Sequence, residues 1–199
     1  MGAFLLGSAY RSFSKDTIHV AVVDSDVGTS RHAVLRVSPN GLFLAPDNGL
    51  LTYLLRDNAE YNEASQTRVF LEPMGLSVPF GYAAYTLSHW DRWNFHVSNT
   101  FYGRDIFASV AGHLSLGILP EEVGESLCSL TCLCISHPHW HGDTVQGYVI
   151  HIDRFGNLIT IVGSNVPEQN SIEVLFKNRK IKGITKYIRG RGGPIRDRG

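Results

Sequence analysis

The sequence predicts an α/β fold with a mostly parallel sheet, followed by an all-β region. Residues 18–23 form a continuous apolar run rich in β-branched side chains, which is typical of a buried parallel strand. Apolar side chains at helical spacing over residues 104–116 predict a helix with one face on a core, and Gly117 is placed to end it. Beyond residue 142, three strand-like runs follow without a helix, at residues 145–152, 158–162 and 171–176.

The first half of the chain alternates helices, strands and turns. A helix is expected over residues 3–13, and a turn over residues 24–31. Strands are expected at residues 32–37 and 42–45, joined by a turn at Pro39-Asn40-Gly41. A second helix is expected over residues 48–56, with Asp47 near its N-cap, and a short one beginning at Pro120.

These patterns divide the chain into three parts. We expect an α/β domain over residues 1–141, an all-β domain over residues 142–185 and a basic tail over residues 186–199. The tail has too few apolar residues to fold, and a solvated end explains it better than nucleic-acid binding.

The composition is that of an ordinary globular protein, with 43% hydrophobic residues and a formal net charge of +0 at pH 7. No apolar run approaches the roughly 20 residues that span a bilayer, so no membrane association is expected. The three cysteines, Cys128, Cys132 and Cys134, crowd into one apolar stretch. They indicate reduced side chains and a cytoplasmic protein.

Four short segments carry the most specific signal in the chain. They are Val22-Val23-Asp24 with Gly28-Thr29-Ser30-Arg31, Ala45-Pro46-Asp47-Asn48-Gly49-Leu50-Leu51, Thr100-Phe101-Tyr102-Gly103-Arg104-Asp105-Ile106-Phe107, and His151-Ile152-Asp153-Arg154-Phe155-Gly156-Asn157-Leu158. In content and order they resemble the S-adenosylmethionine (SAM) hydroxide adenosyltransferases, the family that also contains the SAM-dependent fluorinase and chlorinase. The resemblance covers the chain from Ile18 to Thr160.

The resemblance implies an α/β domain followed by a small β-barrel domain, with SAM bound between domains of neighbouring subunits of a homotrimer. It also implies that the first strand of the α/β domain is missing here and that the barrel is incomplete. The implied activity is cleavage of SAM by water or hydroxide at C5′ of the ribose, which gives adenosine and L-methionine. SAM is then the substrate, and no cofactor is implied.

Asp24 and Arg31 are the predicted groups for activating the nucleophile. They flank a glycine-containing turn after a predicted strand, the usual place for ligand sites in α/β sheets. A guanidinium can hold hydroxide or polarise water, and a carboxylate beside it can orient it. The spacing alone fits an ion pair that stabilises the turn equally well, and the resemblance favours catalysis.

Tyr102 is the third predicted catalytic residue and departs from the hydrolytic pattern. By the resemblance, hydrolytic members carry histidine there and halide-using members carry tyrosine. Histidine can take a proton from water near neutral pH, whereas tyrosine stays protonated and only donates. Three alternatives stay open: a chlorinase-like use of halide, a non-catalytic remnant, and His96 as a substitute for the missing histidine.

The resemblance also implies the residues that bind the substrate, with Asp153 and Asn157 contacting the amino-acid and adenosine portions of SAM. The predicted set is Asp47, Asn48, Phe101, Gly103, Asp105, Asp153, Phe155 and Asn157. From the residues alone, Asp47-Asn48 is a helix start, Asp105 offsets a helix dipole, and residues 153–157 form a β-turn.

A zinc site is a remote alternative. His137, His139 and His141 stand at alternate positions, and residues 139–143 match the His-x-His-x-Asp start of a zinc-binding pattern. Imidazole is a normal zinc ligand. The full pattern needs histidine after Asp143, where this chain has Thr144, so no metal is expected.

Overall fold

The computed structural model describes residues 1–24, 31–55, 73–89, 92, 97–98, 100–133, 135, 138–162 and 172–182. Contacts divide the chain into two compact units, Met1–Ile135 and Ser136–Gly199. The predicted boundary after His141 falls within the second unit, between two paired strands. The assignment of domains to residues 1–141 and 142–185 stays a prediction.

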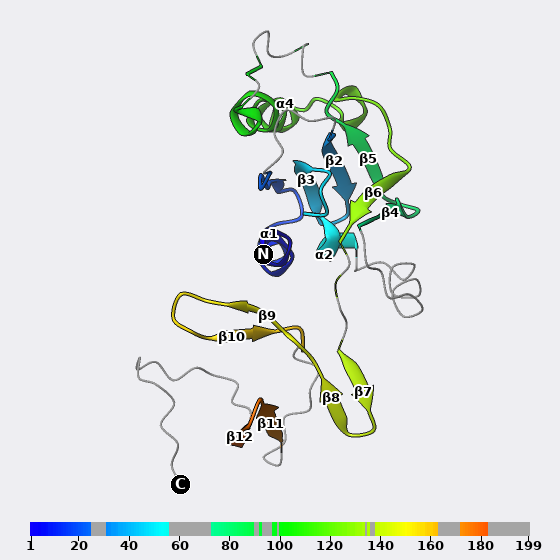
Figure 1. Cartoon of the computed structure of the whole chain (residues 1–199). Coiled ribbons are helices and arrows are strands. Elements are labelled where there is room, and N and C mark those ends of the chain that lie inside the picture. The colour runs from blue at the N-terminus through cyan, green and yellow to red at the C-terminus, as the bar shows by residue number, and fades with distance from the viewer. Residues whose placement is uncertain are drawn as a thin grey trace. The chain divides into compact units, whose positions relative to one another are not determined.

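The first unit is built on a four-stranded sheet with the strand order β1-β3-β2-β5 (Figure 1). Its strands are β1 (Ile18–Val20), β2 (Ala33–Ser38), β3 (Gly41–Pro46) and β5 (Ala83–Thr86). β1 pairs with β3 in parallel, whereas β2 pairs antiparallel with both β3 and β5. All three strands expected in residues 18–45 are thus present.

The expectation of a mostly parallel sheet is wrong for the part of the chain that the structure describes. Two of the three strand pairings are antiparallel, because the predicted turn at Pro39-Asn40 joins β2 directly to β3. A connection this short can link only antiparallel neighbours. β1 is also shorter and more exposed than predicted, with Val22 and Val23 at the surface, since β1 has one partner in this sheet.

Helical segments cover both faces of this sheet, which makes the first unit a mixed α/β structure, as predicted. On one face, α1 (Gly2–Ala9), η1 (Tyr10–Ser12) and α2 (Thr52–Leu55) share a core with Val34 and Phe43. On the other, the π-helical η3 (Gly103–Ala108) and α4 (Ser109–Ser115) pack on Leu35 and Leu44. Neighbouring residues of β2 and β3 face opposite sides, as the strand period requires. Figure 1 shows α1 and α4 on either side of the sheet.

Three of the predicted helices are close to their expected positions, and the first of them, expected over residues 3–13, is formed by α1 and η1. η3 and α4 together fill most of residues 104–116, and Gly117 follows with a φ of +96°. The short helix at Pro120 is η4 (Pro120–Glu122), in which the Leu119 amide donates to the Glu122 carboxylate over 2.9 Å. No helix in the described ranges is long and apolar enough to cross a membrane.

The helix expected over residues 48–56 begins four residues late, at Thr52, and is described to Leu55. The side chain of Asn48 accepts the Leu50 amide over 3.1 Å, and the Thr52 hydroxyl donates to the Gly49 carbonyl over 2.6 Å. These bonds hold a turn where helix was expected, because short polar side chains compete for backbone groups. Asp47 is consequently not the N-cap of α2.

Two further strands close the first unit and were not predicted. β4 (Met74–Ser77) and β6 (Ser129–Cys132) pair antiparallel, with Leu76 opposite Leu130. Both are short, and β6 lies in the cysteine-rich apolar stretch. Leu130 and Cys132 join the same core as α1 and α2.

The second unit contains only β-structure in its described residues, as three antiparallel hairpins. They are β7 (His139–His141) with β8 (Thr144–Gln146), β9 (Val149–Ile152) with β10 (Leu158–Thr160), and β11 (Glu173–Phe176) with β12 (Arg179–Lys182). The single strand expected over residues 145–152 is interrupted at Gly147. A Cβ there would lie 2.3 Å from the Val162 side chain, so the chain bends around a close contact.

Gly41→Ala should destabilise the first unit strongly. Gly41 has a φ of +122°, and an added Cβ would lie 2.5 Å from the Thr17 carbonyl oxygen. Backbone strain and this clash together should lower the free energy of unfolding by about 3 kcal/mol. Gly81→Ala is the matched control, because Gly81 has a φ of +82° but open space around it, and it should lose about 1 kcal/mol. Equal losses in urea unfolding would contradict the close approach of residues 17 and 41.

Candidate active site

Strand direction gathers the predicted catalytic segments at one edge of the first unit's sheet. β1, β3 and β5 run in the same direction, so their carboxyl ends meet at this edge. β2 runs the opposite way, and its first residues lie there too, with Ala33 opposite Pro46 and Val34 opposite Thr86. Ligand sites of α/β sheets usually lie beyond the carboxyl ends of strands.

Asp24 and Arg31 meet at this edge, as the sequence predicted. Arg31 Nη1 donates to Asp24 Oδ1 over 2.7 Å. The Asp24 side chain is 8% exposed and that of Arg31 is 27% exposed, so solvent screens the pair only in part. The ion pair links the end of β1 to the start of β2, and the residues between its partners lie outside those described.

Asp47 and Asn48 hold the two segments that carry this ion pair. Asn48 Nδ2 donates to the Val23 carbonyl over 2.7 Å, directly before Asp24. The Asp47 amide donates to the His32 carbonyl over 2.9 Å, directly after Arg31. Asp47 Oδ1 in turn accepts the Thr131 amide of β6 over 2.7 Å. The contacts of Asp47 and Asn48 are therefore those of positioning residues, and their predicted contact with substrate stays a prediction.

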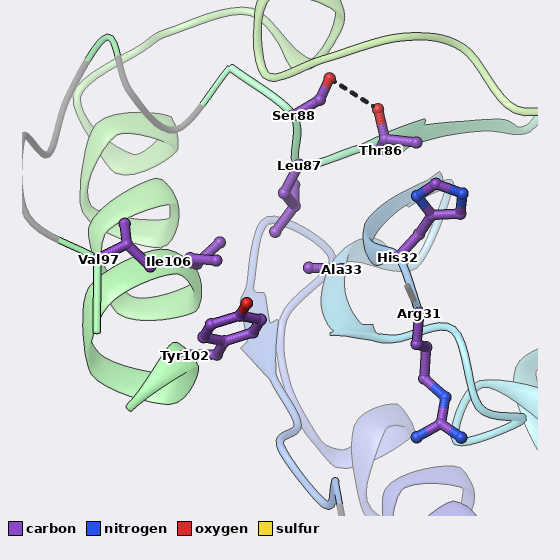
Figure 2. A pocket seen from close by; sticks show the side chains of 9 residues that line it. All are labelled: Arg31, His32, Ala33, Thr86, Leu87, Ser88, Val97, Tyr102 and Ile106. Carbon is purple, nitrogen blue, oxygen red and sulfur yellow. Dashed lines mark hydrogen bonds between the residues drawn. The ribbon is translucent and has the colours of Figure 1, made fainter. Parts of the chain in front are cut away.

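A cavity of about 230 Å³ lies at the same edge (Figure 2). Figure 2 shows the Tyr102 hydroxyl pointing into the space among Ile106, Leu87 and Ala33, while the Arg31 side chain extends away from that group. Two of the three predicted catalytic residues therefore line one cavity, and the third is bound to one of them. The lining consists of Arg31, His32, Ala33, Thr86, Leu87, Ser88, Val97, Tyr102 and Ile106.

Three polar residues of this cavity were missed from the sequence: His32, Thr86 and Ser88. The hydroxyls of Thr86 and Ser88 lie 2.9 Å apart, and the Thr86 hydroxyl accepts the Glu125 amide over 3.0 Å. Thr86 is the last residue of β5, and Ser88 lies two residues further on. This short strand was not predicted. Residues 83–86 read Ala-Ala-Tyr-Thr, which has no alternation of apolar and polar side chains that would have predicted this strand.

Asp105 is buried and anchors the start of η3. It accepts the Ser98 amide over 2.8 Å and pairs with the Arg104 guanidinium. The Arg104 hydrogen bond, followed by the Ser98 amide, holds the pKa of the Asp105 carboxyl well below its usual range. The carboxylate is thus engaged by its own segment, and its predicted contact with substrate stays a prediction.

Phe101 and Gly103 lie on the same segment as Tyr102 but face different surroundings. The Phe101 ring is exposed, and the Arg104 guanidinium lies 5.0 Å from its centroid. Gly103 packs beside Val22, since a Cβ on it would lie 3.7 Å from that side chain. The segment therefore contacts the stretch that follows β1, two residues before Asp24.

Asp153 and Asn157 come together in the second unit and close the turn between β9 and β10. Asp153 Oδ1 accepts the amides of Phe155 and Asn157, each over 2.8 Å, and Asn157 Nδ2 donates to Asp153 Oδ2 over 2.7 Å. The Asn157 side chain is the main reason that the pKa of the Asp153 carboxyl is lowered. Phe155 is exposed under Arg154, whose guanidinium lies 4.7 Å from the ring centroid. The turn is as predicted from the residues alone, and the role in SAM binding stays a prediction.

The remote zinc alternative gains no support from the described part of the chain. His139 and His141 are exposed on β7, and His137 lies outside the described residues, as does His96. Within the described ranges, no group of three or more histidine, cysteine, aspartate or glutamate residues could hold a metal ion.

Comparison with known proteins identifies relatives of this arrangement. A family described as the SAM hydroxide adenosyltransferase N-terminal domain matches residues 1–124. The (R)-S-adenosyl-L-methionine hydrolase of Methanocaldococcus jannaschii is 30% identical over 192 residues, which cover 94% of this chain and 59% of that protein. The enzyme of the same name from Thermus thermophilus is 33% identical over 163 residues, covering 79% of this chain and 55% of that protein.

A solved structure has the same fold over most of the chain. The crystal structure of an uncharacterized conserved protein from Thermotoga maritima superimposes with a TM-score of 0.75 at 28% identity, and covers 94% of this chain and 66% of that chain. The chain spans between about half and three-fifths of the length of the curated relatives described above.

Asp105→Asn should lower the melting temperature near neutral pH, and the deficit should shrink below about pH 4. The folded-state pKa of Asp105 is depressed, so the ionised carboxylate stabilises the fold above the ordinary carboxyl pKa. That contribution is lost as the pH falls through the ordinary value toward the depressed one. Thermal unfolding across this range measures it, with Asp143→Asn in the exposed β7–β8 turn as a control without effect. A deficit independent of pH would contradict the assigned charge interaction.

Proposed function

The chain belongs to the SAM hydroxide adenosyltransferase family, and we propose that it cleaves SAM by attack of water or hydroxide at C5′ of the ribose. The products are adenosine and L-methionine. The observation that carries the proposal is the Asp24–Arg31 ion pair beside a cavity that Arg31 and Tyr102 line together. The hydrolase names of the relatives support the same reaction.

The leaving group of this reaction needs no catalytic help, whereas the nucleophile must be positioned accurately. As the water oxygen bonds to C5′, the C–S bond breaks, and its electron pair goes to sulfur, so that methionine leaves as a neutral thioether. The water proton passes to the protein or to solvent. Because the sulfonium carries its own driving force for departure, the protein's task is to hold an oxygen nucleophile in line with the C–S bond.

Arg31 is proposed to bind the nucleophile oxygen, with Asp24 fixing its guanidinium. The cation favours hydroxide or polarised water, and the carboxylate keeps the guanidinium in one orientation. Tyr102 is proposed to donate a hydrogen bond to the nucleophile from the apolar side of the cavity. Val97, Leu87 and Ile106 give that side of the cavity an apolar lining, and an apolar surrounding strengthens electrostatic interactions.

The remaining predicted residues are proposed to bind SAM in two groups. Asp47, Asn48, Phe101, Gly103 and Asp105 border the nucleophile site, and Asp153, Phe155 and Asn157 contact the amino-acid and adenosine portions. Asp153 suits the methionine ammonium because its pKa is lowered, which keeps it ionised. The exposed Phe155 ring suits a flat base.

The assembly and setting of the protein are proposed on the family resemblance. The hairpins of the second unit are proposed to belong to a small β-barrel domain over residues 142–185. SAM is proposed to lie between domains of neighbouring subunits in a homotrimer. The protein is proposed to act in the cytoplasm, and the reaction requires no cofactor because SAM supplies its own activated carbon.

A halide as the nucleophile is the second candidate, and Tyr102 is the observation that favours it. A phenol can donate to chloride as readily as to hydroxide but does not take a proton from water at neutral pH. The Asp24–Arg31 pair favours water instead, because it supplies the arrangement expected for holding hydroxide.

Product analysis tests the two candidates directly. The full chain is incubated with SAM, with and without chloride, and the products are separated by chromatography. Adenosine and methionine in equal amounts in both reactions are expected. A 5′-chloro-5′-deoxyadenosine product that requires chloride would replace hydrolysis by halide transfer. Folded protein that makes neither nucleoside would contradict both and leave a non-catalytic remnant.

Arg31→Ala should reduce the rate of adenosine formation by about 10²-fold or more, because the oxygen nucleophile loses a fixed charged donor. SAM affinity, measured by calorimetry, should change little. Arg31→Lys keeps the charge without the planar fork and should recover only part of the rate. Arg179→Ala, on the exposed strand β12, is the control that should behave as wild type. Undiminished turnover in Arg31→Ala would contradict the mechanism.

A further inference from the structure

Hydrolysis releases one proton from the attacking water, and the groups assigned so far do not readily accept it. Arg31 is a permanent cation, and the Tyr102 hydroxyl is assigned as a hydrogen-bond donor to the nucleophile. Asp24 already bonds to Arg31, and it does not line the cavity. The proton needs an acceptor within reach of the nucleophile.

We infer that His32 is this acceptor, an inference that rests on the proposed hydrolysis. His32 lines the same cavity as Arg31 and Tyr102. Its backbone is fixed, since its carbonyl accepts the Asp47 amide over 2.9 Å. Figure 2 shows its imidazole on the side of the cavity where Thr86 lies. Within the described part of the chain, the imidazole makes no hydrogen bond that would occupy its ring nitrogens.

The other polar groups of the cavity do not serve as well. The Thr86 hydroxyl accepts the Glu125 amide and pairs with the Ser88 hydroxyl, and neither hydroxyl takes up a proton near neutral pH. An imidazole changes its charge between about pH 5 and pH 8. Among the residues described as lining the cavity, His32 is therefore the side chain suited to general-base catalysis.

The step balances without any further reactant. The water oxygen forms a bond to C5′ while Arg31 holds it, and the C–S electron pair goes to sulfur. Figure 2 shows the His32 imidazole and the Arg31 guanidinium extending in opposite directions, so the proton reaches a ring nitrogen of His32 through a second water in the cavity. The imidazolium then gives this proton to solvent. The titratable or charged groups on the elements around His32 are Arg31 before β2, Asp24 after β1, Asp47 after β3, His89 after β5, Glu125 beside β5, Tyr102 before η3, and Arg104 and Asp105 on η3.

His32→Gln tests the inference through the pH dependence of kcat/KM for adenosine formation. In the wild type, kcat/KM should rise with pH through the range where imidazole loses its proton. The variant should lack this rise and be about 10²-fold to 10⁴-fold slower near neutral pH. Its SAM affinity should match that of the wild type, because the imidazole acts on the water. His89→Gln is the matched control: His89 bonds to the Glu122 carbonyl outside the cavity, and its replacement should keep the profile.

His32→Ala with added imidazole is the second test. His32 is exposed, so its truncation leaves no buried void, and imidazole in the buffer should restore part of the rate. An unchanged pH profile in His32→Gln, or no rescue of His32→Ala, would overturn the assignment while adenosine formation by the wild type still supports the proposed function. Wild-type protein that forms no adenosine would overturn both.

Discussion

The short turn between β2 and β3 determines where the candidate catalytic residues lie. It forces β2 to run antiparallel to β3, while β1 runs parallel to β3. The end of β1 and the start of β2 therefore meet at one edge of the sheet, which brings Asp24 to Arg31. Because strand side chains alternate in direction, a shift in the pairing of β2 by one residue would turn its core side chains to the opposite face of the sheet.

A network of hydrogen bonds then fixes what the turn has brought together. Asn48 holds the carbonyl before Asp24, and the Asp47 amide holds the carbonyl after Arg31. Asp105 ties the segment around residue 98 to the helical start that carries Tyr102. A site that must aim a nucleophile along one bond needs such support, because a displacement of about 1 Å can cost a large factor in rate. We therefore interpret these residues as holding the segments of Asp24, Arg31 and Tyr102 in place for catalysis.

Local patterns predicted those features that depend on neighbours in the chain. Pro39-Asn40-Gly41 predicted the hairpin turn, and residues 153–157 predicted the turn that Asp153 closes. The pairing of Asp24 with Arg31 was expected from both spacing and family resemblance. The predicted turn at Pro39-Asn40-Gly41 already required β2 and β3 to run antiparallel. The expectation of a mostly parallel sheet came from the continuous apolar run over residues 18–23, which reflects burial rather than strand direction. The bond from Asp47 to the Thr131 amide spans 84 residues and has no local signature. His32, Thr86 and Ser88 were missed for the same reason, since only the pairing of β2 with β5 places them at one cavity.

The central claim is that an oxygen from water, held beside Arg31, ends on C5′ of the ribose. Turnover of SAM in oxygen-18 water, followed by mass spectrometry of the nucleoside, tests it most directly. The account predicts adenosine that carries the heavy isotope in its 5′-hydroxyl group and methionine that carries none. Adenosine without the isotope, or a nucleoside bearing a different 5′ group, would contradict it.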